Sequence, residues 1–155
     1  MFDKIYKIYS TGEIMNQTHD YIAVFDSGVG GISVLRHLIR HMPGERFLYY
    51  GDSANAPYGS RSTAEVRALT LAAAEKLTTE YPIKALVIAC NTATAAAIRT
   101  LREEYPIKFI GMEPAIKPAA QLTRTGIVGV LATAGTLKSE KYLRHKEKYA
   151  SDIRI

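Results

Sequence analysis

The chain has 155 residues, with 20 basic and 15 acidic side chains, one cysteine and 47% hydrophobic residues. This composition is typical of a folded globular protein with one domain, or one domain and the start of a second, and excludes a disordered or fibrous chain. A single cysteine excludes a disulfide within the chain and indicates a reducing compartment, so we expect a cytoplasmic protein.

The net charge of +5 would favour a nucleic-acid partner only if the basic residues formed a stripe. Their excess instead lies in residues 121–155, mostly in 138–148, where the two signs alternate as on a solvated helix face. No run approaches the ~18 apolar residues of a membrane-spanning helix. We therefore expect neither a nucleic-acid nor a membrane partner.

The first 20 residues carry lysines but no continuous apolar region after them, so they do not form a signal peptide. The alternation of Phe2, Ile5 and Ile8 is weak. We expect residues 1–20 to be a leader outside the fold.

From residue 21 onward, short apolar runs rich in β-branched residues alternate with segments of helical spacing. One helix is expected around residues 32–39, and a second begins at Ser62, where Glu65 completes the spacing of a capping box. A third is expected over residues 93–101. Prolines at the ends of the last two helices stop them before the next strand. The predicted strands are residues 21–25, 47–50, 85–89, 109–110 with Ile107, and 127–131.

This alternation predicts an α/β fold built from βαβ units, with a parallel sheet flanked by helices on both faces. Strands buried on both faces read as continuous apolar runs, and residues 85–89 do so. Ligands of such folds bind beyond the carboxyl ends of the strands. The residues that follow each strand are therefore the candidates for function.

Small polar residues follow most of the predicted strands, at positions 26–31, 51–59, 90–94 and 132–136. Together they could hold a small polar ligand at one sheet edge. The dinucleotide fingerprint fails because Ser33 occupies the place of its third glycine. The glycines of the first turn then serve either a tight packing turn or a ligand cradle, and both interpretations stay open.

Cys90 is the most informative residue of these turns. A lone cysteine is often a small buried hydrophobe, but Cys90 lies where a buried strand ends and a helix begins. Exposed N–H groups and the positive end of a helix stabilise a thiolate there. Arg99 is too far along for a phosphatase-type cysteine, and acyl transfer needs a positioned histidine. Proton transfer by the thiol remains, since no strand end carries His19, His37, His41 or His145.

His37 and His41 have the spacing of metal ligands on a helix. No glutamate follows His37, and no third ligand is evident. We interpret the pair as part of a solvated helix face and predict no metal site.

The strand-end turns resemble those of the glutamate racemases, within the cofactor-independent aspartate/glutamate racemase family. The resemblance covers about residues 21–150. It rests on the matching segments 24–31, 50–59 and 89–95, and on the weaker segment 129–133 with Thr136.

The resemblance implies interconversion of L- and D-glutamate without a cofactor, the D-form supplying peptidoglycan synthesis. Two cysteines act in this family, one on each side of the substrate α-carbon, and Cys90 matches the first. Asp26 matches a group that assists proton transfer and suits the substrate ammonium, although a turn or helix cap is the alternative for it. A homodimer stays open. The matching substrate-binding positions are Asp26, Ser27, Tyr58, Gly59, Asn91 and Thr92, with Thr133 and Thr136 as further contacts.

The second cysteine of the family has no counterpart before Ile155. We therefore expect residues 21–111 to form a first α/β lobe that carries Cys90, and residues 112–155 to be the start of a second, truncated lobe. One thiol cannot serve both faces of the α-carbon, so this chain alone is not expected to racemise glutamate. An aspartate or other amino-acid racemase of the same superfamily, or a non-catalytic ligand-binding module, remains an alternative.

Overall fold

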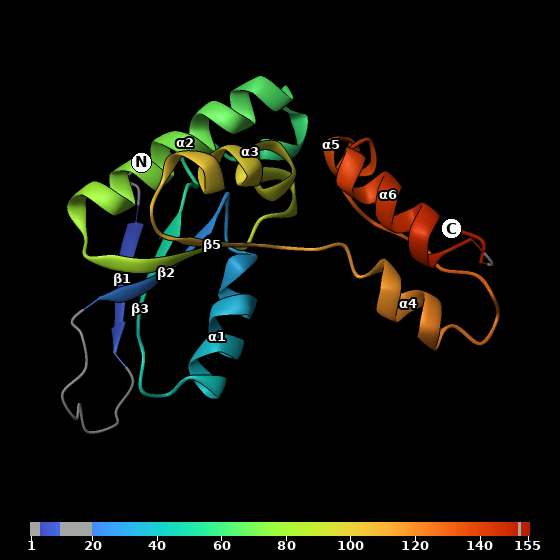
Figure 1. Ribbon diagram of the computed structural model, residues 1–155, viewed down its shortest axis with the longest axis horizontal. Helices are drawn as coiled ribbons and strands as arrows, with labels where there is room; N and C mark the ends of the chain where they lie inside the picture. Colours follow the sequence, from blue (N-terminus) through green and yellow to red (C-terminus); the bar gives the residue numbers. More distant parts are fainter. Residues whose placement is uncertain (1–3, 10–19, 152) are drawn as a thin grey trace.

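The computed structural model describes residues 4–9, 20–151 and 153–155. A five-stranded sheet in the order β1-β3-β2-β4-β5 lies between helices on both faces, as the sequence predicts (Figure 1). The strands are β1 Lys4–Tyr9, β2 Tyr21–Asp26, β3 Arg46–Gly51, β4 Ile83–Ile88 and β5 Lys108–Gly111.

The sheet is parallel from β2 to β5, with Asp26 of β2 opposite Gly51 of β3. β1 instead runs antiparallel to β3 at one edge, so the sheet is mixed. The expectation that residues 1–20 lie outside the fold is therefore wrong for residues 4–9. Ile5 and Ile8 of β1 pack against the cores on opposite faces of the sheet, a two-sided burial that a weak alternation does not reveal. The rest of the expected leader lies outside the described residues, except Asp20.

The helices follow the predicted pattern over the first part of the chain. Ser62 caps α2 and forms the predicted capping box with Glu65, and α3 begins at Asn91 rather than at residue 93. The helices are α1 Gly31–His41, the 3-10 turn η1 Tyr58–Ser60, α2 Thr63–Glu80, α3 Asn91–Glu104, α4 Ile116–Leu122, α5 Ala134–Leu137 and α6 Glu140–Tyr149.

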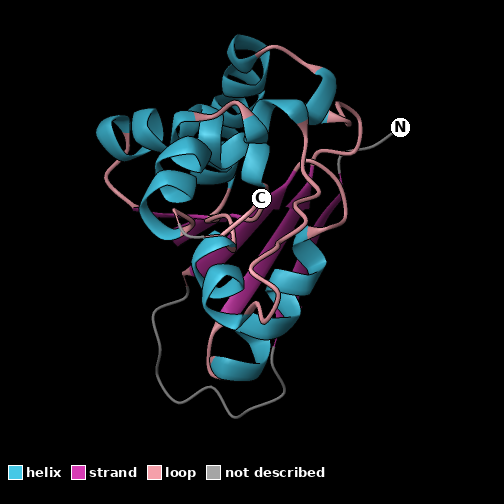
Figure 2. Cartoon of the chain, turned by 90° about the vertical axis from the view of Figure 1, so that its right-hand side faces the viewer, coloured by secondary structure: helices cyan, strands magenta, loops and turns pink. Residues whose placement is uncertain are grey.

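Two apolar cores lie on the two faces of the sheet. On one face, α2 and α3 cover side chains such as Phe25 and Leu86, and on the other α1 covers side chains such as Val24 and Phe47. Figure 2 shows helices above and below the strands. Burial on both faces explains why the central strands read as continuous apolar runs.

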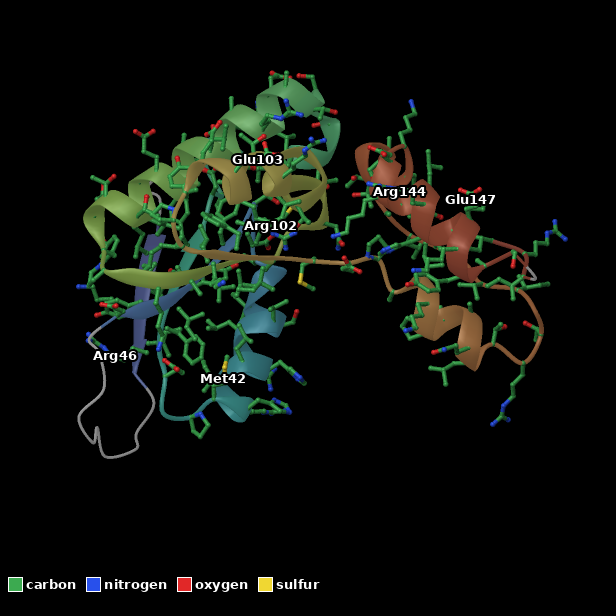
Figure 3. All side chains as sticks on the ribbon, in the orientation of Figure 1. Met42, Arg46, Arg102, Glu103, Arg144 and Glu147 are labelled. Atoms are coloured by element: carbon green, nitrogen blue, oxygen red, sulfur yellow. The ribbon has the colours of Figure 1, made fainter. Side chains whose placement is uncertain are left out.

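Residues 112–155 form a separate group of helices beyond β5, reached by an extended segment (Figure 1). α4 and α6 pack around Ile116, Tyr142 and Ala150. The segment 138–148 falls mostly on α6, whose Arg144 and Glu147 project outward as predicted for a solvated face (Figure 3). The division into two lobes at residue 111 stays a prediction.

The strand predicted over residues 127–131 does not form, which corrects the sequence-based expectation. Ile127 makes one isolated parallel bridge with Arg154, and the Val128 N–H donates to the Arg154 carbonyl at 2.9 Å. Leu131 is fully exposed. A strand needs a neighbouring strand to take its backbone hydrogen bonds, and among the described residues only this bridge is present. No helix in the described part of the chain is long and apolar enough to cross a membrane.

Candidate functional site

A cavity of about 440 Å³ opens at the carboxyl-end edge of the sheet. It lies between the ends of β2 and β4, the η1 turn and the start of α5. Parallel strands bring their carboxyl ends to one edge, which is why turns far apart in the sequence meet here. The lining includes every residue proposed from the sequence for the site: Asp26, Ser27, Tyr58, Gly59, Cys90, Asn91, Thr92, Thr133 and Thr136.

Cys90 is separated from the end of β4 by one residue and is the N-cap of α3. Its Sγ accepts a hydrogen bond from the Ala93 N–H at 3.4 Å and lies 3.4 Å from the Ser27 Oγ. The side chain is almost buried and faces the cavity. The Ala93 N–H, the Ser27 hydroxyl and the positive end of α3 thus lie around the sulfur.

Asp26 ends β2 and lies buried beside the cavity. Its Oδ2 accepts a hydrogen bond from the Gly31 N–H at 2.8 Å, at the first turn of α1. The capping role considered for Asp26 is therefore present, and it uses only Oδ2 of the carboxylate.

Gly31 lets α1 approach the sheet closely. A side chain there would place a Cβ 2.8 Å from the Asp26 Cβ and 3.0 Å from the Ala89 Cβ, closer than carbon atoms pack. The glycines of this turn therefore include one that serves tight packing between helix and strand.

Tyr58 forms a wall of the cavity with its hydroxyl turned away. The hydroxyl donates to Asp52 Oδ2 at 2.6 Å, and the ring packs near Phe25. Burial, followed by the hydrogen bond to Asp52, raises the pKa of Tyr58 above its ordinary value, so the hydroxyl stays protonated. The sequence reasoning did not single out Asp52, although a carboxylate directly after a predicted strand was an available signal.

A cluster of threonine hydroxyls lines the cavity beside the η1 turn. Thr92 Oγ1 lies 3.1 Å from Thr133 Oγ1, and Thr133 caps α5 by accepting from the Thr136 N–H at 3.2 Å. Gly59 permits this arrangement, because a Cβ there would lie 2.5 Å from Thr133 Cγ2. The η1 turn and the start of α5 are therefore in direct contact.

The cavity lining contains no lysine, arginine or histidine among the residues that the structure describes. A ligand carboxylate would therefore be held by hydroxyl, amide and N–H groups, including those of Ser27, Asn91 and Thr92. The carboxylate of Asp26 suits a ligand ammonium. A thiol beside donors for a carboxylate and an acceptor for an ammonium is equipped for proton transfer at the α-carbon of an amino acid.

No group of three or more potential metal-binding side chains occurs within residues 4–9, 20–151 and 153–155. His37 and His41 lie on the exposed face of α1 with ring centroids 4.1 Å apart. Their placement is that of the solvated helix face expected from the sequence.

Comparison with known proteins connects this arrangement to one family. The sequence model of the family described as Asp/Glu/Hydantoin racemase matches residues 26–154. A glutamate racemase of Ectopseudomonas mendocina is 52% identical over 142 residues, which cover 91% of this chain and 54% of the relative. One of Clostridium acetobutylicum is 53% identical, with 91% and 55% covered. The chain spans about half the length of these curated relatives.

Solved structures show the same likeness. A glutamate racemase of Escherichia coli, in complex with L-glutamate and the activator UDP-MurNAc-ala, is 38% identical with a TM-score of 0.81; the match covers 87% of this chain and 52% of the other. Isoform RacE1 of Bacillus anthracis is 39% identical with a TM-score of 0.75, covering 89% and 52%. The likeness therefore extends to the fold.

Proposed function

This chain belongs to the Asp/Glu/hydantoin racemase family, and from this premise we propose that it forms the part of a glutamate racemase that carries one of two proton-transfer thiols. The curated relatives bear that name, and one solved relative holds L-glutamate. The D-glutamate formed would supply peptidoglycan synthesis, and so cell-wall biogenesis, in the cytoplasm, where a free thiol stays reduced.

Cys90 is the proposed catalytic residue for one face of the substrate. As a thiolate it takes the α-proton, leaving the electron pair on the α-carbon; as a thiol it gives a proton to the same face in the reverse direction. A second thiol must serve the opposite face, and this chain has only one cysteine. Because an α-proton is weakly acidic, the reaction depends on donors that stabilise the negative charge developing at the substrate carboxylate.

The other residues are proposed to hold the substrate in place. Asp26 receives the ammonium group and assists proton transfer, while Ser27, Asn91 and Thr92 donate to the carboxylate. Tyr58 and Gly59 line the cavity, with Thr133 and Thr136 next to them. The observation that carries the proposal is Cys90, hydrogen-bonded to Ser27 and to the Ala93 N–H at the floor of this cavity.

Incorporation of solvent deuterium at the α-carbon tests the proposal with the 155-residue chain. In D₂O we expect the chain to exchange the α-hydrogen of one glutamate enantiomer without inverting it. NMR measures the exchange, and circular dichroism measures any inversion. Cys90→Ser should abolish exchange, because a serine hydroxyl is far less acidic than a thiol. Thr78→Val, at a half-buried position of α2 outside the cavity lining, serves as a control.

The possible results of this experiment distinguish the proposed role of Cys90 from the alternatives. Exchange that survives Cys90→Ser would refute the role of Cys90, and inversion by this chain would refute the need for a second thiol. Binding of glutamate without exchange would favour the non-catalytic module. Faster exchange with aspartate than with glutamate would favour the aspartate alternative.

A further inference from the structure

We propose that Asp52 is a positioning residue for the cavity: through the hydroxyl of Tyr58 it holds the η1 turn in the place where Thr133 packs against it. Asp52 does not line the cavity itself. The proposed consequence for substrate rests on the function proposed above, whereas the consequence for the turn does not.

Asp52 is a buried carboxylate satisfied by neutral donors. It is 2% exposed, and it accepts from the Tyr58 hydroxyl at 2.6 Å and from Asn55 Nδ2 at 2.9 and 3.1 Å. Within the described part of the chain, no cationic side chain forms an ion pair with it. Burying a charge without a cation is costly, and an apolar side chain would serve packing at lower cost. The arrangement therefore fits a role in orienting its two donors.

The backbone ties Asp52 to the edge of the sheet. Its N–H donates to the Asp26 carbonyl at 2.9 Å, directly after β2 and β3 end side by side. The chain then turns back, and Tyr58 returns to Asp52. The Tyr58 ring packs with its centroid 6.4 Å from that of Phe25. Tyr58 is thus held at both ends, by Phe25 at its ring and by Asp52 at its hydroxyl.

The position of η1 directly affects the start of α5, which is in contact with it. Gly59 follows Tyr58, and its Cα lies so close to Thr133 that a Cβ would come within 2.5 Å of Thr133 Cγ2. Thr133 in turn shares a hydroxyl contact of 3.1 Å with Thr92, in the first turn of α3, whose N-cap is Cys90. A shift of Tyr58 would therefore displace two walls of the cavity.

A carboxylate suits this position better than an amide does. Both of its oxygens only accept, so it can receive the Tyr58 hydroxyl and the Asn55 amide at once, whereas Asn at position 52 would turn an NH₂ group toward one of these donors. The raised pKa of Tyr58 keeps its hydroxyl a donor at physiological pH. Asp52 and Tyr58 therefore form one unit, which predicts that their substitutions are not additive.

The test compares Asp52→Asn, Tyr58→Phe and the double variant with the wild-type 155-residue chain. Thr70→Val is the matched control, because Thr70 is also buried and donates to the Val66 carbonyl, but within α2. NMR reports the contact between the Gly59 Hα and the Thr133 methyl group. Amide exchange of Arg61, whose N–H donates to the Tyr58 carbonyl at 3.1 Å, reports the η1 turn.

In each single variant we expect the Gly59–Thr133 NOE to weaken at least about threefold and the Arg61 amide to exchange about tenfold faster, since a hydrogen bond to a charged group is lost or weakened. The double variant should match the single ones. Amides of β4 and the Thr70→Val control should not change. If Asp52→Asn fails to fold, Tyr58→Phe, which removes one oxygen, decides the outcome. An unchanged NOE and unchanged Arg61 exchange would overturn the proposal.

Substrate kinetics add a readout that a purely structural role would not change. The glutamate concentration for half-maximal deuterium exchange should rise about tenfold, while the maximal rate falls less than about threefold, because Asp52 orients a wall and does not touch the reacting atoms. A loss confined to the maximal rate would contradict positioning. If the wild-type chain exchanges no glutamate, the proposed function fails, and the NOE and the Arg61 amide still decide whether Asp52 positions η1.

Discussion

β2 and the segment 127–131 have similar apolar, β-branched sequences but reach different structures. β2 pairs with β3 and β4 and is buried along its whole length. The segment 127–131 makes one bridge, and Ile127 and Leu131 are exposed. The difference teaches that an apolar run indicates the potential for a strand, while neighbouring strands decide whether it forms.

The same contrast divides the candidate site. Asp26 ends β2 and Cys90 lies shortly after β4, and both are held by backbone N–H groups at helix starts. Thr133 and Thr136 belong to the helical group beyond β5 and reach the cavity through contacts with Gly59 and Thr92. The sheet therefore supports Asp26 and Cys90, whereas contacts between the helical group beyond β5 and the rest of the chain support Thr133 and Thr136.

The largest expected effect is the difference in stability loss between a substitution in the sheet and one in the segment 127–131. Leu86 of β4 is fully buried, so Leu86→Ala should lower the free energy of unfolding by about 3 kcal/mol, through lost burial and a cavity. Leu131→Ala should change it by less than about 0.5 kcal/mol, because this side chain is fully exposed. Urea denaturation followed by circular dichroism measures both. Equal losses would mean that residues 127–131 are buried in solution.

A smaller effect is expected where the two regions meet. Gly59→Ala should cost about 1–3 kcal/mol by overpacking, since its Cβ would meet Thr133 Cγ2 at 2.5 Å. Amide exchange should rise in α5 and not in β2. Thr133→Ser removes that methyl group and keeps the capping hydroxyl, so combining it with Gly59→Ala should restore part of the loss. No restoration would place the strain elsewhere.

Ser62 and Ser139 cap helices in the sheet region and in the helical group beyond β5 through the same kind of hydrogen bond. Ser62 Oγ accepts from the Glu65 N–H at the start of α2, and Ser139 Oγ accepts from the Tyr142 N–H at the start of α6. Ser62→Ala should lower the global free energy of unfolding by about 1 kcal/mol, because α2 covers the main core. Ser139→Ala should raise amide exchange only within α6. A global loss of equal size from Ser139→Ala would show that both regions unfold as one unit.

The smallest effect concerns Glu113, at the start of the helical group. A hydrogen bond from Lys141 and the charges of Lys141, His145 and Arg102 hold the pKa of Glu113 below its ordinary value of 4.5. A carboxyl group whose pKa is lower in the folded state stabilises the fold at pH values above its unfolded-state pKa. This contribution is lost as the pH falls through its folded-state pKa. Because the side chain is 63% exposed, solvent screening keeps the contribution below about 1 kcal/mol.

Glu113→Gln should therefore speed amide exchange in α6 by up to about fivefold at neutral pH, and the difference from wild type should shrink progressively below pH 4.5. Glu103→Gln, which removes an exposed pair with Arg99 on α3, is the matched control and should leave α6 unchanged. A difference that grows with falling pH would contradict the sign of this linkage.

The local elements of residues 20–111 were predictable because their signals lie within a few residues of one another. Ser62 and Glu65 mark the start of α2 by their spacing alone, and the continuous apolar run before Cys90 identifies a strand buried on both faces. The position of Cys90 at a strand end follows from these two kinds of pattern. Parallel strands share one edge, so the polar turns could be expected to gather there.

Other features depended on which surfaces meet. Residues 4–9 form a strand because β3 offers a free edge, and residues 127–131 lack one beyond a single bridge. The direction of the Tyr58 hydroxyl toward Asp52, and the close approach of Gly59 to Thr133, arise from packing between distant segments. The sequence by itself determined the elements and the chemistry at their ends, since those are local; the tertiary structure alone decided which side chains face the cavity and which hold it in shape, since that depends on long-range contacts.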